Sequence, residues 1–239
     1  MSDVKSLLEQ VVAQVPQFAA DLVELFSGPK RFLAARDLTD PATQKRALIF
    51  YVLSMLFAFV LYLPFQPPDA NVTIYVTKLL VYDIVSTLAF TFLILLSWKI
   101  VGGNAPLKAY FVITLYASAI MTVVVALGAL VSKGVFRAYA PDELPAFIDL
   151  IDRAMFMDYH ALDARLLEAG VLPWALLVFL IVGLIPCWTY IVLFWGSYRQ
   201  LNGLSRARSC FAFLACAILS QPWAFLVGLG ARAMDLMIF

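Results

Sequence analysis

The sequence contains few of the side chains on which enzymes rely. Histidine occurs once, at His160, and the three cysteines Cys187, Cys210 and Cys216 form no Cys-x-x-Cys pair. The chain also has no phosphate-binding glycine loop, no His-Glu zinc helix and no nucleophile flanked by glycines. These absences argue against a disulfide framework, a metal site and the usual histidine-based acid–base catalysis. We therefore expect a protein that is not an enzyme and that holds no metal or cofactor.

Charged side chains are scarce as well. Asp, Glu, Lys and Arg make up 14% of the chain and hydrophobic residues 63%, where soluble proteins have about a quarter and about a half. The 17 basic and 16 acidic residues nearly cancel, with a net charge of +1. Nucleic-acid binding is not expected, because no basic excess is present to attract phosphate. A soluble domain of this length could not bury so much apolar surface, so a membrane protein is predicted.

The apolar residues gather in five runs of roughly the 20 residues that cross a ~30 Å hydrocarbon layer as a helix. Without the alternation of a barrel strand, such runs satisfy their backbone groups as α-helices. The sequence therefore predicts an all-α protein with a five-span membrane domain over residues 47–239. The spans are Ala47–Phe65, Leu79–Ile100, Tyr110–Val131, Leu172–Trp195 and Cys210–Gly230.

The distribution of basic residues predicts the orientation in the membrane. Five of them lie within residues 30–46, just ahead of the first span, whereas residues 66–77 after it contain no Lys or Arg. Because cytoplasmic loops are enriched in Lys and Arg, the amino terminus is expected in the cytoplasm and, after five spans, the carboxyl terminus outside it. No cleavable signal pattern precedes the first span, which we expect to act as an uncleaved signal anchor. The basic residues of the inner side are Lys30, Arg31, Arg36, Lys45, Arg46, Lys99, Lys108, Arg199, Arg206 and Arg208.

Residues 1–46, ahead of the first span, carry their own helical pattern. Apolar residues recur at three-and-four spacing over residues 4–15, and a second apolar patch covers residues 18–26. Pro16 is expected to end or kink the first helix, and Ser27-Gly28-Pro29 to break the chain. Asp40-Pro41 is a typical helix start. The pattern fits amphipathic helices that lie on the inner membrane surface or on the ends of the spans, and equally a docking surface for a cytoplasmic partner.

The outer loop, residues 132–171, also alternates apolar residues with acids at helical spacing. We expect one or two amphipathic helices that pack over the outer face of the membrane domain, in preference to a ligand site. His160 lies in this loop without a partner carboxylate or cysteine at ligand spacing, so a metal or catalytic role is not expected.

Asp83 is the one acidic residue inside a predicted span. Such groups usually face a bundle interior or water and pair with something, and Lys78 or Arg232 are the candidate partners in the sequence. Pro186 and Pro222 should each bend a span unless neighbours compensate. Helix packing explains these features, but a transporter could also use them to build a site at mid-membrane. The candidate intramembrane polar site consists of Asp83, Ser220 and Gln221.

The two predicted inner connections carry a resemblance to a known family. The segment 100–110 with its Gly102-Gly103 turn, followed by Leu115-Tyr116-Ala117-Ser118, resembles the Gly-Gly turn and Tyr-Ala/Ser stretch of the Yip domain family, the Ypt-interacting polytopic membrane proteins. The segment 201–208 is similar to that family's basic Gly-Leu-Ser turn. Residues 25–32 resemble the proline-containing entry of its bacterial-type members.

The resemblance implies a five-span membrane protein with a cytoplasmic amino terminus, which works in complexes with other membrane proteins and with lipids. Eukaryotic relatives associate with Rab-type GTPases, but this chain lacks their long acidic or proline-rich cytoplasmic tail, which makes GTPase binding doubtful. A bacterial cytoplasmic (inner) membrane is the expected location. Candidate contacts for a partner or a lipid at the inner face are Gly102, Gly103, Lys108, Gly203, Arg206 and Arg208.

These residues also have a simpler interpretation as topology anchors, in which the glycines reverse the chain and the cations meet the headgroups. The leading hypothesis is a non-enzymatic membrane scaffold, adaptor or accessory subunit. The alternative is a transporter or channel for ions or small molecules, built on the intramembrane polar residues and the proline-bent helices.

Overall fold

The computed structural model describes residues 2–65, 72–139, 141–145, 147–148 and 180–238, which form helices and turns and contain no strand. The fold class is all-α, as predicted. In this described part, four helical segments are long and apolar enough to cross a membrane, which marks the chain as an integral membrane protein. These segments are Pro41–Phe65, Leu79–Ile100, Leu107–Tyr139 and Ile181–Asn202.

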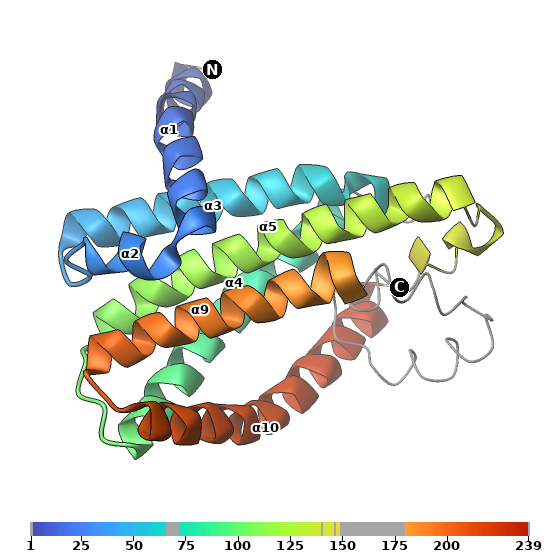
Figure 1. Ribbon diagram of the computed structural model, residues 1–239. Coiled ribbons are helices and arrows are strands. Elements are labelled where there is room, and N and C mark those ends of the chain that lie inside the picture. The colour runs from blue at the N-terminus through green and yellow to red at the C-terminus, as the bar shows by residue number, and fades with distance from the viewer. Residues whose placement is uncertain (1, 66–71, 140, 146, 149–179, 239) are drawn as a thin grey trace.

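The central helix of the bundle is α5 (Leu107–Tyr139). It packs against α3 (Pro41–Tyr62), α4 (Val72–Ile100) and α9 (Ile185–Asn202), and α4 packs in turn against α10 (Arg206–Ile238). Figure 1 shows these helices side by side, with α1 (Ser2–Ser27) rising away from them. A single 3-10 turn, η1 (Leu63–Phe65), follows α3.

The helices α3, α5 and α10 begin, and α4 and α9 end, at one end of this bundle (Figure 1). We call it the basic end, because Lys45, Lys99, Lys108, Arg199 and Arg206 all lie there. The start of α3 is confirmed as predicted: Asp40 is its N-cap and accepts a hydrogen bond from the Thr43 backbone N–H at 3.1 Å. That bond satisfies an N–H group that has no partner within the helix.

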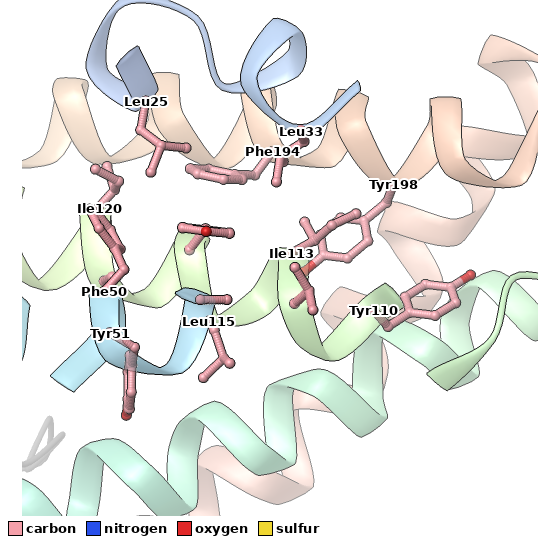
Figure 2. Packing of buried hydrophobic residues seen from close by; sticks show 14 of the residues in the cluster. Leu25, Leu33, Phe50, Tyr51, Tyr110, Ile113, Leu115, Ile120, Phe194 and Tyr198 are labelled. Carbon is pink, nitrogen blue, oxygen red and sulfur yellow. The ribbon is translucent and has the colours of Figure 1, made fainter. Parts of the chain in front are cut away.

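Aromatic and aliphatic side chains from five helices meet toward the basic end. Phe50 of α3, Trp98 of α4, Tyr116 of α5 and Phe194 of α9 are each at most 2% exposed and belong to one cluster. Figure 2 shows part of this core. The two helices ahead of the membrane domain contribute to it as well, so the core joins residues 1–46 to the bundle.

The break between those two helices falls where the sequence predicts it. Helix α1 ends at Ser27 and α2 (Pro29–Ala34) begins one residue after Gly28. Leu25 of α1 and Leu33 of α2 are 0% and 3% exposed in the core. The prediction that Pro16 could end the first helix is wrong, because α1 continues through it. The side chains of residues 1–12 lie outside the described ones.

Most helices extend beyond the predicted spans, among them α4 and α5. Helix α4 begins at Val72, seven residues before Leu79, and α5 continues to Tyr139, eight residues past the predicted limit. Ser132 and Phe136 are buried, and Phe136 stacks on Phe147 with ring centroids 4.3 Å apart. This packing keeps the helix intact where polar residues indicate a loop. In the rest of the predicted outer loop the structure describes residues 141–145 and 147–148, and Pro141–Glu143 form a 3-10 turn, η2. The other residues of this loop, including His160, lie outside the described ones.

The prolines occupy two different positions. Pro186 is the second residue of α9, directly after a π-helical segment, η3 (Leu180–Leu184), so its missing N–H falls in the first turn of an α-helix. Pro222 lies inside α10, which changes direction along its length (Figure 1). At the π segment, a Cβ added to Gly128 of α5 would lie 2.9 Å from the Gly183 Cα, so the two backbones meet closely.

Candidate functional site

Asp83 lies in a polar cluster formed by three helices. The Tyr51 hydroxyl of α3 donates a hydrogen bond to the Asp83 Oδ2, and the Thr122 hydroxyl of α5 donates to the Oδ1 at 3.4 Å. The Thr87 Oγ1, one turn further along α4, lies 3.2 Å from the Tyr51 hydroxyl. Figure 2 shows Tyr51 extending from α3 toward α4. The cluster therefore ties α3 and α5 to the carboxylate of α4.

The cluster is mostly withdrawn from the surface: Tyr51 and Thr87 are each 4% exposed. Burying a carboxylate in an apolar medium is costly, and hydroxyl donors offset part of that cost. Among the described side chains, no Lys or Arg forms an ion pair with Asp83. The carboxylate is thus held by neutral donors alone within the described part of the chain.

A cavity of about 280 Å³ adjoins Asp83 and Thr122 between α3, α4 and α5. Its wall contains three aromatic residues, Phe59, Tyr62 and Tyr82, and is otherwise apolar. A second cavity of about 380 Å³ lies between the same helices on the side of Tyr51 and Thr87. Met55 and Leu80 line both cavities. The polar cluster therefore lies between the two cavities, with Asp83 and Thr122 facing the first and Tyr51 and Thr87 facing the second.

The other two residues of the predicted intramembrane site are not joined to Asp83 by any described hydrogen bond. Ser220 and Gln221 both donate to the Ala217 carbonyl of their own helix, at 2.8 and 3.4 Å. The side chains of the predicted ion-pair partners Lys78 and Arg232 lie outside the described ones. The observed partners of Asp83, Tyr51 and Thr122, were not predicted, because a hydroxyl inside an apolar helix gives no sign of which helix it will meet.

The predicted inner-face residues come together at the basic end. Gly102 and Gly203 have φ angles of +91° and +60°, in the left-handed region that favours glycine. The Gly103 N–H donates to the Trp98 carbonyl at 2.8 Å, which closes the end of α4. Arg208 lies beside the first turn, with its Nη1 3.8 Å from where a Gly102 Cβ would be. Lys108, Arg206 and Arg208 are exposed.

Asn202, to which the sequence analysis gave no role, joins the two turns. Its Oδ1 accepts hydrogen bonds from the Ala105 backbone N–H at 3.3 Å and from the Tyr110 hydroxyl at 2.9 Å. Its Nδ2 donates to the Tyr198 carbonyl at 2.9 Å. Tyr110 stacks on Tyr198, with centroids 5.7 Å apart, and the hydroxyls of Tyr198 and Thr114 lie 2.7 Å apart. One amide therefore fixes both connections against the core.

A second unpredicted cluster holds α1 against the bundle. Asp21 is 2% exposed, and its Oδ2 accepts a hydrogen bond from the Arg46 Nε of α3 at 2.7 Å. The Arg36 Nη2 lies 3.8 Å from the Asp21 Oδ1 and 3.4 Å from the Glu24 Oε2. The Arg36 guanidinium also covers the Phe32 ring at 3.4 Å. Asp21 and Arg46 are 25 residues apart, a spacing that no local pattern reveals.

The part of the chain that the structure describes contains no group of three or more His, Cys, Asp or Glu residues arranged to hold a metal ion. Comparisons of the chain with protein-family models, with curated proteins and with solved structures found no match.

Proposed function

We propose that the chain is a non-enzymatic integral membrane scaffold, adaptor or accessory subunit that acts through contacts with other membrane proteins and with lipids. The observation that carries this proposal is the attachment of residues 1–46 to the membrane domain. Leu25, Phe32 and Leu33 are buried in the bundle core. Asp21 forms salt bridges with Arg36 and with Arg46, and the second of these attaches the same part of the chain to α3. A fixed surface of this kind suits protein recognition, because little entropy is lost on binding.

The exposed face of α1 offers apolar surface to such a partner. Val23 is 69% exposed, beside the exposed Glu24. Isolated exposed apolar residues are common on proteins, so the argument rests on the rigidity of the attachment and not on Val23 alone.

The membrane arrangement that we propose has five spans, the fifth being the Cys210–Gly230 segment within α10. The amino terminus lies in the cytoplasm with the basic end, and the carboxyl terminus lies outside. Support comes from the collection of cations at one end of the bundle (Figure 1) and from the positive-inside rule. The resemblance of the two turns to the Yip family favours the same topology, with a bacterial inner membrane as the location and GTPase binding doubtful.

Site-specific photo-crosslinking in native membranes tests the scaffold proposal. A photoreactive phenylalanine analogue at Val23 should capture a discrete polypeptide, because this face of α1 stands clear of the core. Val192 of α9 is the matched control, since it is 63% exposed on an apolar span and should give lipid adducts only. The proposal would be contradicted if neither position forms an adduct with a polypeptide and the purified chain, without any partner, turns over a substrate.

A transporter is the second candidate, and the cavity beside Asp83 is the observation that favours it. Reconstituted vesicles should then show a solute or ion flux that the Asp83→Asn variant loses. A flux that is unchanged in the variant, or absent from both proteins, removes this candidate and leaves the scaffold.

A further inference from the structure

The cavity beside Asp83 combines a carboxylate with aromatic walls. Phe59, Tyr62 and Tyr82 line the same 280 Å³ space as Asp83, and Tyr62 is only 6% exposed. Aromatic faces attract cations through their quadrupole, and the attraction grows when the cation is desolvated. A neutral ligand could at most donate a hydrogen bond to the carboxylate, and an anionic ligand would be repelled, so the wall chemistry favours positive charge.

The hydrogen bonds leave the Asp83 carboxylate capacity for a cation. Its two oxygens provide about four acceptor sites, of which Tyr51 and Thr122 occupy two. These donors come from different helices and fix the orientation of the carboxylate at the cavity wall. Apart from the Asp83 carboxylate and the Thr122 and tyrosine hydroxyls, the lining side chains carry no oxygen, which favours a weakly hydrated organic ammonium over a small metal ion that needs several oxygen ligands.

The adjoining second cavity indicates the shape of the ligand. Apart from the hydroxyl groups of Tyr51 and Thr87, its lining consists of apolar side chains such as Leu56, Ile84 and Phe111. Met55 and Leu80 form the boundary between the two spaces, so a hydrocarbon tail would pass from the first cavity into the second by displacing these two side chains. A head with one positive charge and a tail without polar atoms would match the two spaces.

We propose that the paired cavities between α3, α4 and α5 form a binding site for an amphiphile with an organic ammonium head, the head lying between Asp83 and the aromatic residues and the alkyl tail in the apolar cavity. This site is independent of the scaffold proposal, since it requires neither a protein partner nor transport. The ammonium group is shared by free alkylamines and by the choline or ethanolamine heads of phospholipids.

The test uses the full chain in nanodiscs of phosphatidylglycerol, a lipid without an ammonium group. Hexyltrimethylammonium is titrated by calorimetry, with hexanol and hexanoate as neutral and anionic probes of the same chain length. We expect hexyltrimethylammonium to bind at least tenfold more tightly than either control probe after the signal of empty phosphatidylglycerol nanodiscs, whose anionic lipid attracts cations by itself, is subtracted. Equal affinity for hexanol would overturn the proposal, because the site would then recognise only the tail.

Two variants locate the head group. Asp83→Asn should weaken hexyltrimethylammonium binding by about tenfold or more and leave hexanol binding unchanged. Asp142→Asn, an exposed carboxylate beyond the end of α5, is the matched control and should bind as the original chain does. An unchanged affinity in Asp83→Asn overturns the assignment.

A further variant keeps the test decisive if Asp83→Asn does not fold. Phe59→Leu retains an apolar wall and removes one aromatic face, so it should lower the affinity for the trimethylammonium probe by about fivefold and spare hexanol. Equal losses for both probes would contradict the aromatic contribution. Replacing the phosphatidylglycerol by phosphatidylcholine or phosphatidylethanolamine then identifies the source: competition with the probe indicates a lipid head, and no competition indicates a free amphiphile.

Discussion

The ion cluster at Asp21 should govern how firmly α1 is attached to the membrane domain. Asp21 is 2% exposed and contacts Arg46 and Arg36, which are 38% and 18% exposed. Removing one partner of a fully buried pair costs about 3–5 kcal/mol, whereas an exposed pair contributes about 0–1 kcal/mol. Because both arginines can rehydrate in part, we expect Asp21→Asn to weaken the attachment of α1 by about 2 kcal/mol, between those two limits.

Thiol labelling at position 25 measures this loss. Leu25 lies on the face of α1 that packs against the core and is fully buried. In a chain without its native cysteines, the thiol of a Leu25→Cys variant should therefore react with the label only when α1 detaches. A cost of about 2 kcal/mol corresponds to a labelling rate about 30-fold higher in the Asp21→Asn background. The matched control is Glu24→Gln: Glu24 also contacts Arg36 but is 62% exposed, and its loss should change the rate about twofold or less.

The reasoning is refuted if Asp21→Asn and Glu24→Gln raise the labelling rate equally. A double-mutant cycle with Arg46→Gln measures the interaction free energy between Asp21 and Arg46. The effect of Asp21→Asn on the labelling rate should largely disappear once position 46 carries a neutral side chain. An undiminished effect in the Arg46→Gln background would assign the stabilisation to contacts other than this ion pair.

Three further predictions concern the described helices and turns. Gly128→Ala should lower the melting temperature in detergent, because its Cβ would meet the Gly183 backbone at 2.9 Å; Gly134→Ala, in the same helix with nothing within 4 Å, should leave it unchanged or raise it, and equal shifts would contradict the close approach. Asn202→Ala should cost about 1–3 kcal/mol in denaturant unfolding, because it leaves the Ala105 N–H and the Tyr110 hydroxyl without their acceptor; an unchanged midpoint would remove the role assigned to the amide. The Thr39 hydroxyl and backbone N–H donate to Asp37 and lower the pKa of its carboxyl below the ordinary 3.8. Its stabilising effect is therefore present above the unfolded pKa and is lost as the pH falls through the folded one. A carboxyl NMR titration should show the lowered pKa, and Thr39→Ala should raise it part of the way, because the backbone N–H still donates; identical titrations would contradict the turn.

The sequence predicted those features that depend on neighbours along the chain. The all-α class follows from the length of the apolar runs, the start of α3 from Asp40-Pro41, and the break after Ser27 from Gly28-Pro29. The outer end of α5 was missed because Ser132 and Lys133 indicate a loop, whereas burial of Phe136 against Phe147 continues the helix. Periodicity cannot report packing against a distant segment.

The candidate sites show the same limit more strongly. Asp83 was found because a charge in an apolar run is unusual, but its grouping with Ser220 and Gln221 came from shared polarity and not from any contact. Its observed partner Tyr51 is separated from it by 32 residues, and Asn202 reaches Ala105 across 97 residues. Such pairs depend on helix packing angles and on register, which one sequence does not specify.

We propose that the chain crosses the membrane five times with its basic end in the cytoplasm. Single cysteines in a cysteine-free chain, labelled with an impermeant maleimide on intact spheroplasts, test it directly. Asn104→Cys and Tyr139→Cys mark the two ends of α5, both at exposed positions, and a cysteine appended after Phe239 marks the carboxyl terminus. We predict that the thiol at position 139 and the appended thiol react from outside, whereas the thiol at position 104 reacts only after permeabilisation. The fifth span would be contradicted if the appended thiol, like the thiol at position 104, is labelled only in permeabilised cells.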